Sequence, residues 1–312
     1  MAKSVLIVNP QARGGWAQKK WPVLEPMLRD ALGVIEVQFT KRAGDGVPLA
    51  KAAARAGAEL VVAMGGDGTA SEVASGLLAA FAESPSGEPS CSFGYLPCAT
   101  GGDLRRILGT PSEVDVAARA IASARPRPID AGRIDYIGHD GKPHSGYFIN
   151  VASCGISGLV DHLVNEGSKA FGGKATFFIA SLRATLRYKN ALVRVRLDDQ
   201  PSYEERIYTF AVANGGYFGG GMQIAPEAKI DDGIFDITTL GDLSLVEALR
   251  LGGLIYKGEQ GRLSKVSARR ARRVVVEPVN PDEKVLLDVD GETPGRLPAT
   301  FTLLPGALLY RG

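Results

Sequence analysis

The chain has 312 residues, 45% of them hydrophobic and 22% charged, which excludes wholesale disorder and leaves room for two domains. Its formal net charge of +2 gives no argument for a nucleic-acid partner. No apolar run approaches the ~20 residues that span a bilayer, and residues 1–5 lead directly into a strand-like segment. The three cysteines lack a C-x-x-C spacing, which favours buried thiols in a reducing compartment. We therefore expect a cytoplasmic protein without a signal peptide.

Strand-like and helix-like segments alternate over the first ~130 residues. Continuous apolar runs predict buried strands at residues 5–8, 60–64 and 93–96, and an alternating pattern predicts a more exposed strand at 35–39. Helices are expected near residues 14–24, 48–57, 70–81 and 104–108. This order predicts an α/β fold with a doubly wound parallel sheet, whose ligands bind beyond the carboxyl ends of the strands.

A glycine turn, Gly-Gly-Asp-Gly-Thr at residues 65–69, joins the strand at 60–64 to the helix at 70–81. Strand, glycine turn and helix together aim free backbone N–H groups at an anion, usually a phosphate. Asp67 would repel a phosphate unless a cation lay between them, and a metal-bound nucleotide triphosphate would resolve that conflict. A tight corner without a ligand explains the turn equally well. Asn9 and residues 100–103 follow two other predicted strands and are expected at the same edge.

The pattern changes after about residue 133, where strands follow one another with few helices between them. They are predicted at residues 147–151, 192–197, 206–213, 235–239, 274–277, 285–289 and 301–304. This favours a C-terminal antiparallel β-sandwich-like domain. Helical segments are expected at residues 158–188, which could cover a pocket or cap the sheet, and at 245–256. The predicted domains are residues 1–131 and 132–301, and a return of residues 302–312 to the first domain is left open.

Three charged segments in the second half each allow two interpretations. The acidic turn at residues 225–236 could bind a hard cation or be an ordinary Asp-Gly turn. Asp290 and Glu292, separated by a glycine, could point into one cleft and take a proton from a hydroxyl, or simply form a hairpin turn. The arginine cluster at residues 269–273 could attract an anionic membrane or discourage edge pairing.

Taken together, these motifs resemble the diacylglycerol kinase catalytic-domain family, which includes sphingosine and ceramide kinases and bacterial lipid kinases. The resemblance runs from residue 5 to about residue 309 and rests on motifs in a fixed order. They are Asn9-Pro10 with Gly14-Gly15, residues 65–69, Pro97 with residues 100–103, residues 214–221, residues 226–236 and residues 290–292. The resemblance implies an N-terminal domain that binds ATP with Mg²⁺, a C-terminal domain that holds a lipid, and an active site between them.

The resemblance also assigns roles to residues. Asp290 matches the general base, Glu292 its neighbour, and Asp67 the acid that helps to hold the catalytic Mg²⁺. The carbonyls of Lys229 and Ile234 and the carboxylate of Asp232 match a structural Mg²⁺ site. The positions expected to contact the nucleotide are Asn9, Thr40, Gly65, Gly66, Asp67, Gly68, Thr69, Ser71, Glu72 and Thr100.

Ser71 and Gly102 depart from the family pattern, which usually has asparagine at both positions. With these two departures the chain could select its nucleotide differently or be an inactive member of the family. The acidic residues that it retains favour an active enzyme. We expect transfer of the ATP γ-phosphate to a hydroxyl of diacylglycerol or a related lipid, during transient peripheral contact with a membrane. The alternatives are an NAD kinase-like enzyme and a non-catalytic regulator that binds lipid or nucleotide. The sequence leaves open which lipid is the acceptor and whether the chain forms a homodimer.

Overall fold

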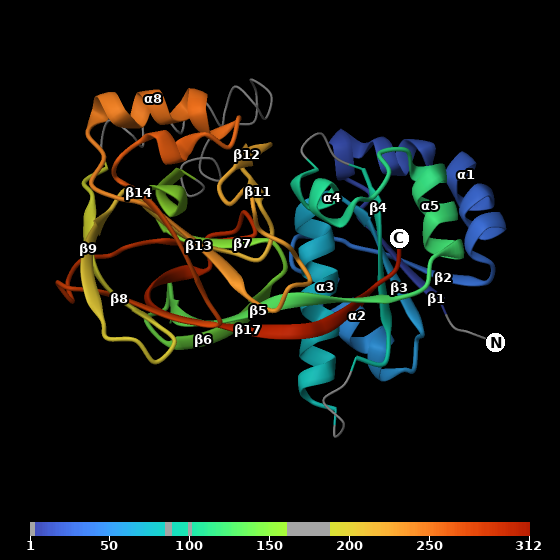
Figure 1. Cartoon of the computed structure of the whole chain (residues 1–312). Coiled ribbons are helices and arrows are strands. Elements are labelled where there is room, and N and C mark those ends of the chain that lie inside the picture. The colour runs from blue at the N-terminus through green and yellow to red at the C-terminus, as the bar shows by residue number, and fades with distance from the viewer. Residues whose placement is uncertain (1–3, 85–88, 99–101, 161–187) are drawn as a thin grey trace.

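The computed structural model describes residues 4–84, 89–98, 102–160 and 188–312. Within these ranges the strands form a ten-stranded mixed sheet, a five-stranded antiparallel sheet and a two-stranded hairpin. Figure 1 shows the N-terminal α/β part on the right and the C-terminal β-rich part on the left. The predicted fold class, a parallel-sheet domain followed by an antiparallel sandwich-like domain, is confirmed.

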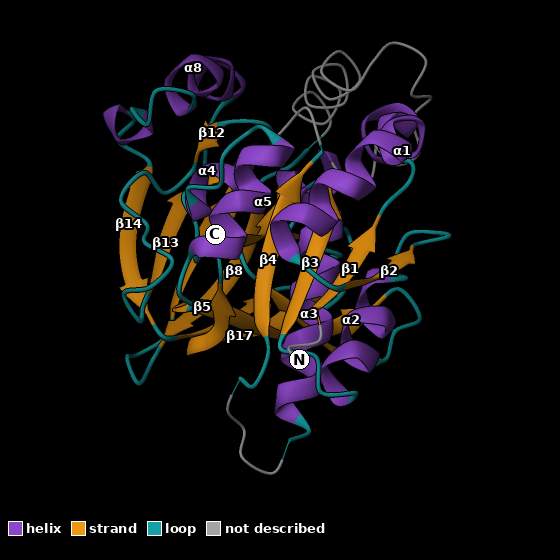
Figure 2. Ribbon diagram, turned by 90° about the vertical axis from the view of Figure 1, so that its right-hand side faces the viewer, coloured by secondary structure: helices purple, strands orange, loops and turns teal. Residues whose placement is uncertain are grey.

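The N-terminal domain is built on four parallel strands in the order β2-β1-β3-β4. Side chains alternate between the two faces of these strands: α2 and α3 pack on one face, and α1 and α5 on the other (Figure 2). The predicted edge position of residues 35–39 is also observed. The strands are β1 (Ser4–Val8), β2 (Ile35–Phe39), β3 (Leu60–Gly65) and β4 (Ser92–Pro97). The helices are α1 (Ala12–Leu32), α2 (Gly46–Arg55), α3 (Asp67–Ala82), α4 (Asp103–Leu108) and α5 (Val114–Ser123).

The C-terminal domain is a sandwich whose core is filled from both sheets, for example by Val195 and Phe301 from one sheet and Phe210 and Ile237 from the other. The larger sheet contributes β5 (Arg127–Gly138), β6 (Pro143–Phe148), β8 (Ala191–Leu197), β9 (Tyr203–Ile207), β15 (Arg273–Pro278) and β17 (Gly295–Tyr310). The five-stranded sheet contains β7 (Val151–Gly155), β10 (Thr209–Ala213), β13 (Phe235–Leu240), β14 (Val266–Ala271) and β16 (Leu287–Val289). The remaining elements are the hairpin β11 (Tyr217–Phe218) and β12 (Met222–Gln223), the helix α8 (Leu245–Ile255) and the 3₁₀ turn η2 (Gln260–Arg262).

Two of the predicted strands are wrong in the same way. Residues 147–151 and 206–213 were each expected to form one strand, but each is divided into two strands that belong to different sheets, β6 with β7 and β9 with β10. Apolar residues continue across both breaks because the strands on either side face the same core. The hydrophobic pattern therefore could not reveal where the chain crosses between the sheets. The helical segment expected at residues 158–188 lies almost wholly outside the described residues.

The long strands β5 and β17 connect the two domains. They pair antiparallel along most of their length, and the end of β17 pairs parallel with β4 through Leu309 and Tyr310. Figure 1 shows the two strands running side by side from one domain into the other. Residue 131, the predicted boundary, lies inside β5. The domains thus share one continuous sheet, and the end of the chain returns to the N-terminal domain.

A buried carboxylate, Asp130, fixes this junction. Its two oxygens accept hydrogen bonds from the backbone N–H groups of Gly233 and Gly306, each at 2.7 Å. Its own N–H donates to the carbonyl of Ile230 at 2.7 Å. Asp130 on β5 therefore holds the acidic turn at residues 225–236 and the irregular part of β17 between Leu304 and Leu308 against one another.

We expect Asp130→Ala to lower the free energy of unfolding by about 2 kcal/mol or more, because two backbone donors lose their charged acceptor. The change would be measured as a shift in the midpoint of denaturant unfolding. Asp135→Ala is the matched control on the same strand, since its ion pair with Arg133 at 2.8 Å is partly exposed and should contribute less than about 1 kcal/mol. Equal losses in the two variants would contradict the role assigned to Asp130.

Candidate active site

The carboxyl ends of the parallel strands meet at one edge, as predicted. The strand register places Val8 beside Phe39 and Met64, so the residues that follow, Asn9, Thr40 and Gly65, lie together. The Asn9 side chain donates to the Thr69 hydroxyl at 3.1 Å, and the N–H of Thr40 donates to the carbonyl of Val8 at 2.9 Å. Thr100, which was expected here as well, lies outside the described residues.

The glycine turn after β3 is tightly packed at its first residue. A Cβ on Gly65 would lie 2.5 Å from the hydroxyl oxygen of Thr69, whereas a Cβ on Gly68 would meet nothing within 4 Å. Gly66 precedes the helix, and α3 begins at Asp67. The first turn of α3 has backbone N–H groups without intrahelical acceptors, which is an arrangement that binds phosphate.

Asp67 is oriented by two donors from the neighbouring strand and helix. Its carboxylate accepts from the Tyr95 hydroxyl at 3.0 Å and from the backbone N–H of Asp103 at 2.8 Å. Burial, together with the charge of Asp67, raises the pKa of the Tyr95 hydroxyl above its ordinary value. Tyr95 therefore remains a donor and holds the carboxylate in one orientation.

Asp103, at the start of α4, connects this edge to the C-terminal domain. It is buried, and its carboxylate accepts from Arg106 at 2.6 Å and from the backbone N–H of Gly220 at 2.7 Å. Burial raises the pKa of the Asp103 carboxyl, the nearby Asp67 adds to the rise, and the two donors oppose it.

Asp290 follows β16 and is held from both domains. Its carboxylate accepts from the Ser71 hydroxyl on α3 at 2.6 Å and from the backbone N–H groups of Ile149, Asn150 and Val151 at 3.0, 3.1 and 3.1 Å. The residue has a φ of 51°, which is uncommon for any residue other than glycine. The backbone strain at this position is therefore maintained by the same four hydrogen bonds.

The environment of Asp290 also affects its protonation. The residue as a whole is half-buried, but its carboxylate lies among protein atoms, and this burial raises the pKa of the Asp290 carboxyl above its ordinary value. The hydroxyl of Ser71 and the three backbone donors stabilise the ionised form and oppose the rise.

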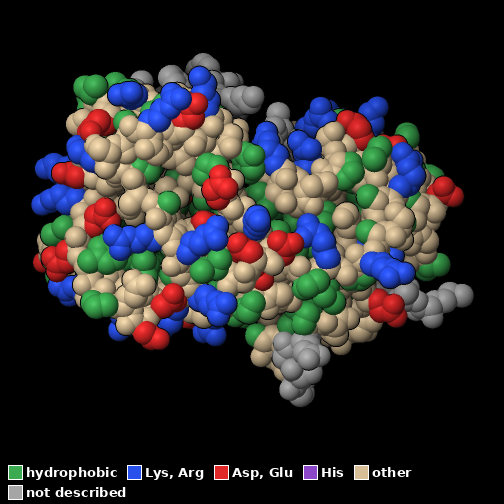
Figure 3. Space-filling model, viewed as in Figure 1, with side chains coloured by type: hydrophobic (Ala, Val, Ile, Leu, Met, Phe, Trp, Pro, Cys, Tyr) green, Lys and Arg blue, Asp and Glu red, His purple; other side chains and the backbone are tan. Residues whose placement is uncertain are grey.

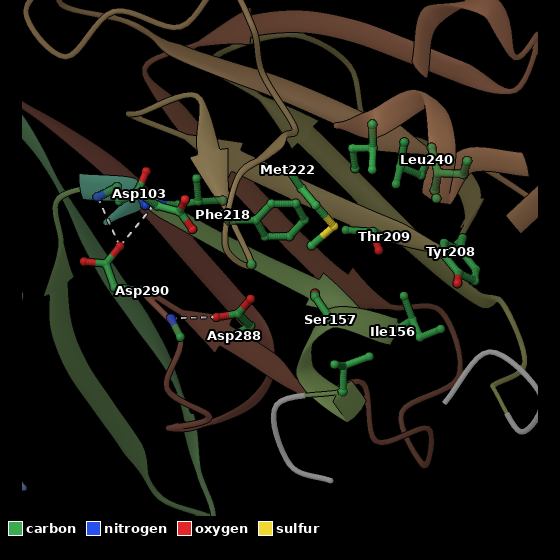
Figure 4. Close-up of a pocket in the computed structure, with 18 of the residues that line it drawn as sticks. Asp103, Ile156, Ser157, Tyr208, Thr209, Phe218, Met222, Leu240, Asp288 and Asp290 are labelled. Atoms are coloured by element: carbon green, nitrogen blue, oxygen red, sulfur yellow. Dashed lines mark hydrogen bonds between the residues drawn. The ribbon is translucent and has the colours of Figure 1, made fainter. Parts of the chain in front are cut away.

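Asp67 and Asp290, from opposite halves of the sequence, line the same pocket of about 360 Å³. Asp103 and Asp288 line it with them, and Figure 4 shows Asp103, Asp288 and Asp290 near one end. The rest of the wall is largely apolar and comes from the C-terminal domain: Ile156, Val160, Phe218, Met222, Leu240, Leu251 and Ile255. One cavity therefore joins an acidic end at the domain junction to an apolar chamber beneath α8.

Glu292 lines a second cavity, of about 350 Å³, on the other side of Asp290. Gly68, Ser71 and Glu72 line it as well, and Asp290 lines both cavities. Glu72 was expected to contact the nucleotide; in the structure its carboxylate accepts from the N–H groups of Gly44, in the loop after β2, and of Gly46, the first residue of α2, each at 2.9 Å. It thereby fixes the loop after β2 to α3, and its contact with a nucleotide stays a prediction.

The described residues contain no group of three or more His, Cys, Asp or Glu side chains suited to a metal ion. The predicted structural site uses one carboxylate, Asp232, and the backbone carbonyls of Lys229 and Ile234, so this finding does not decide it. Lys229 and Asp232 are exposed, and the Asp232 carboxylate accepts from the N–H of Ile234 at 3.4 Å. A structural Mg²⁺ at this turn stays a prediction.

Reasoning from sequence missed the groups that orient the acids. Tyr95 could have been noticed, because a hydroxyl in a buried apolar strand needs a partner. The backbone donors at residues 149–151 and at Gly220 leave no signal, since almost any residue can supply an N–H group.

Two family models match the chain. Residues 3–134 match the diacylglycerol kinase catalytic domain, and residues 150–310 match the YegS C-terminal NAD kinase beta sandwich-like domain. The two matches adjoin at β5 and β6, where the structure passes from the parallel sheet to the sandwich.

Full-length relatives agree with these models. The chain is 30% identical to a diacylglycerol kinase from Bacillus subtilis (strain 168), over 97% of this chain and 94% of the relative. It is 33% identical to a probable lipid kinase YegS-like from Xanthomonas euvesicatoria, over 85% of this chain and 84% of that one. A crystal structure of a diacylglycerol kinase from Bacillus anthracis strain Sterne superimposes with a TM-score of 0.72 at 22% identity, covering 99% of this chain and 96% of that one, which shows the shared fold.

The glycine turn offers a matched test of packing. Gly65→Ala should lower the free energy of unfolding by about 1–3 kcal/mol, because the new Cβ would overlap the Thr69 side chain. Gly68→Ala should leave stability unchanged or raise it by up to about 1 kcal/mol, because the position is open and helical. Denaturant unfolding of both variants measures the difference, and a Gly65→Ala protein as stable as Gly68→Ala would show that the turn is not constrained as described.

Proposed function

Because this chain is a lipid kinase of the diacylglycerol kinase catalytic-domain family, we propose that it transfers the γ-phosphate of ATP, with Mg²⁺, to a hydroxyl of diacylglycerol or a related lipid. The observation that carries the proposal is the cavity in which Asp67 and Asp290 lie at the end of an apolar chamber. Such a cavity suits an acceptor with a small polar head and hydrocarbon chains.

Asp290 is the proposed general base. It positions the acceptor hydroxyl and takes its proton while the hydroxyl oxygen bonds to the γ-phosphorus and the bond from that phosphorus to the departing ADP oxygen breaks. A carboxyl whose pKa is raised by burial is a better proton acceptor than an ordinary one. Ser71 and the backbone donors at residues 149–151 keep it in one orientation.

The nucleotide is proposed to bind beside the glycine turn. Asn9, Thr69 and the N–H groups at the start of α3 are suitable donors for phosphate oxygens. Mg²⁺ prefers carboxylate oxygens, which Asp67 and Asp103 supply at this edge, and when bound it would neutralise charge on the phosphates. Thr40, Ser71, Glu72 and Thr100 complete the proposed contact region.

We also propose that the protein works in the cytoplasm and binds the membrane surface transiently. Its free cysteines, Cys91, Cys98 and Cys154, are buried, which supports a reducing compartment. No helix among the described residues is long and apolar enough to cross a membrane. The proposed acceptor resides in a bilayer, and transient contact with the membrane surface is the proposed way in which the enzyme meets it.

Labelled ATP, incubated with a total lipid extract and separately with NAD, tests the proposal. A labelled lipid is the expected product, and labelled NADP would favour the NAD kinase-like alternative. If neither product formed although nucleotide bound, the chain would be a non-catalytic regulator.

Asp290→Asn should reduce turnover by about 10²–10⁴-fold, because an amide cannot accept the proton. The rate of lipid phosphorylation at saturating ATP measures this loss, and an unchanged thermal midpoint shows that the variant is folded. Glu292→Gln is the matched control two residues away. Undiminished turnover of Asp290→Asn with a large loss in Glu292→Gln would transfer the role of base to Glu292.

Ser71→Ala should move the acidic limb of the pH–rate profile to higher pH. The base must be ionised, so activity falls as the pH drops through the Asp290 pKa, and loss of the Ser71 donor raises that pKa further. Ser75→Ala, one turn further along α3, removes a weak bond to the Tyr147 carbonyl at 3.5 Å and should leave the limb in place. Identical profiles for the two variants would contradict the assignment.

A further inference from the structure

The helix α8 carries apolar side chains both on its buried side and on its solvent-exposed side. Ala248, Leu251 and Ile255 point inward and line the pocket that contains Asp67 and Asp290. The solvent-exposed side, here called the α8 outer face, consists of Leu245, Val246 and Leu249 together with Tyr256 just after the helix. These side chains are 47%, 75%, 58% and 50% exposed.

This exposure is concentrated in one place. Eight large hydrophobic side chains are exposed among the described residues. Four of the eight belong to the α8 outer face, within residues 245–256. The other four, Val23, Val34, Phe39 and Val116, are spread over the N-terminal domain. A cluster of this kind marks an interaction surface, whereas isolated exposed hydrophobic residues need no explanation.

The helix does not depend on these residues for its own stability. Its N-terminus has a capping box, in which the Ser244 hydroxyl accepts from the N–H of Glu247 and the Glu247 carboxylate accepts from the N–H of Ser244. Lys265 is paired with Glu247 at 2.8 Å, and the inward face packs against the sandwich. The apolar outer face is thus presented by a fixed helix.

Basic side chains surround the same segment. Residues 245–265 include four basic residues, Arg250, Lys257, Arg262 and Lys265, against the two acidic residues Glu247 and Glu259, a net charge of +2. Figure 3 shows hydrophobic and basic side chains, with acidic ones among them, over the part of the surface where α8 lies. Apolar groups bordered by Lys and Arg fit the interface of a bilayer that contains anionic lipids.

We propose that the α8 outer face docks on an anionic lipid bilayer and brings the apolar chamber, which the inner face of the same helix lines, close to the membrane. The proposal rests on the proposed lipid kinase function, because the chamber is taken to receive its acceptor from that bilayer. The helix would lie in the plane of the interface, with its outer face among the head groups and its inner face forming the wall of the acceptor pocket. We favour a bilayer over a second copy of this chain because the helix that carries the exposed apolar residues also lines the apolar pocket with its buried residues.

The arginine cluster at residues 269–273 is a weaker candidate for membrane contact. Arg269 lies over the Tyr203 ring at 4.5 Å, Arg270 is paired with Asp236 at 3.0 Å, and Arg272 donates to the Gly233 carbonyl at 3.1 Å. Arg269 and Arg270 belong to β14, an edge strand of the five-stranded sheet, and Arg272 directly follows it. Their position supports the alternative that they protect the edge.

The first test is co-sedimentation with vesicles of phosphatidylcholine and phosphatidylserine. Val246→Glu combined with Leu249→Glu should weaken binding by about tenfold or more, because two inserted side chains are replaced by anions. The matched control combines Val23→Glu with Val34→Glu, two residues that are 72% and 76% exposed in the N-terminal domain, and should bind like the wild type. Wild-type binding by the α8 variant would overturn the proposal.

The second test measures insertion directly. Burial raises the pKa of Cys91, Cys98 and Cys154 to about 12, about 11 and about 12, so a cysteine introduced at Leu249 can be labelled selectively with an environment-sensitive dye. Vesicles should shift the emission of this dye to the blue and leave a dye at Val23→Cys unchanged. A shift that instead follows protein concentration without vesicles would identify a second copy of the chain as the occupant and overturn the proposal.

A kinase assay separates this inference from the proposed function. The double α8 variant should phosphorylate a dispersed short-chain acceptor at the wild-type rate and lose activity only on acceptor embedded in vesicles, since neither altered residue lines the pocket. Equal loss on both forms would mean that α8 acts on the site and not on docking. If the wild type labelled no lipid at all, the proposed function would fail, and the two binding tests would still decide the docking surface.

Discussion

The site depends on one carboxylate that is shared by two domains. Asp290 accepts one hydrogen bond from α3 and three from the backbone that leads into β7, so its position is defined only when the domains are correctly placed. Removing a carboxylate from water is costly, and charge-assisted hydrogen bonds are what offset that cost. Moving either domain by an ångström or two would leave the charge with fewer donors. The four donors oppose the rise in the Asp290 pKa only while the domains are aligned, so the alignment reduces the free-energy cost of ionising this carboxyl.

The shared sheet makes that alignment rigid. β17 pairs with β5 and β15 in the sandwich and with β4 in the parallel sheet, so the two domains are joined by strand pairing and not by a linker. Asp130 reinforces the same region by holding Gly233 and Gly306. A hinge would need to break ladder hydrogen bonds, and this constraint keeps the glycine turn and the Asp290 turn at one junction.

The elements that could be predicted from the sequence are those whose type and position are determined by one local pattern of apolar residues. The apolar runs at β1, β3 and β4 and the periodic residues of α3 and α8 located these elements to within a few residues. The crossings between β6 and β7 and between β9 and β10 were missed because both strands of each pair face one core. At the site, the resemblance led to Asp67 and Asp290, and the structure places them in one pocket. Backbone donors, and the use of Glu72 to anchor a loop, depend on three-dimensional proximity that no local pattern records.

The helix α8 shows how one element can serve both the pocket and the surface. A helix of a water-soluble domain normally buries one apolar stripe and exposes polar residues elsewhere, so apolar residues on the outside of α8 contribute nothing to the core. Their exposure carries a cost in water that is removed when a bilayer covers them. Because the inner face of the same helix lines the chamber that ends at Asp290, covering the outer face places the lipid phase within one helix diameter, about 10 Å, of the chamber. The distance over which an acceptor must leave the bilayer is thereby kept short, and this is the physical reason for a helix that is apolar on its buried side and on its exposed side.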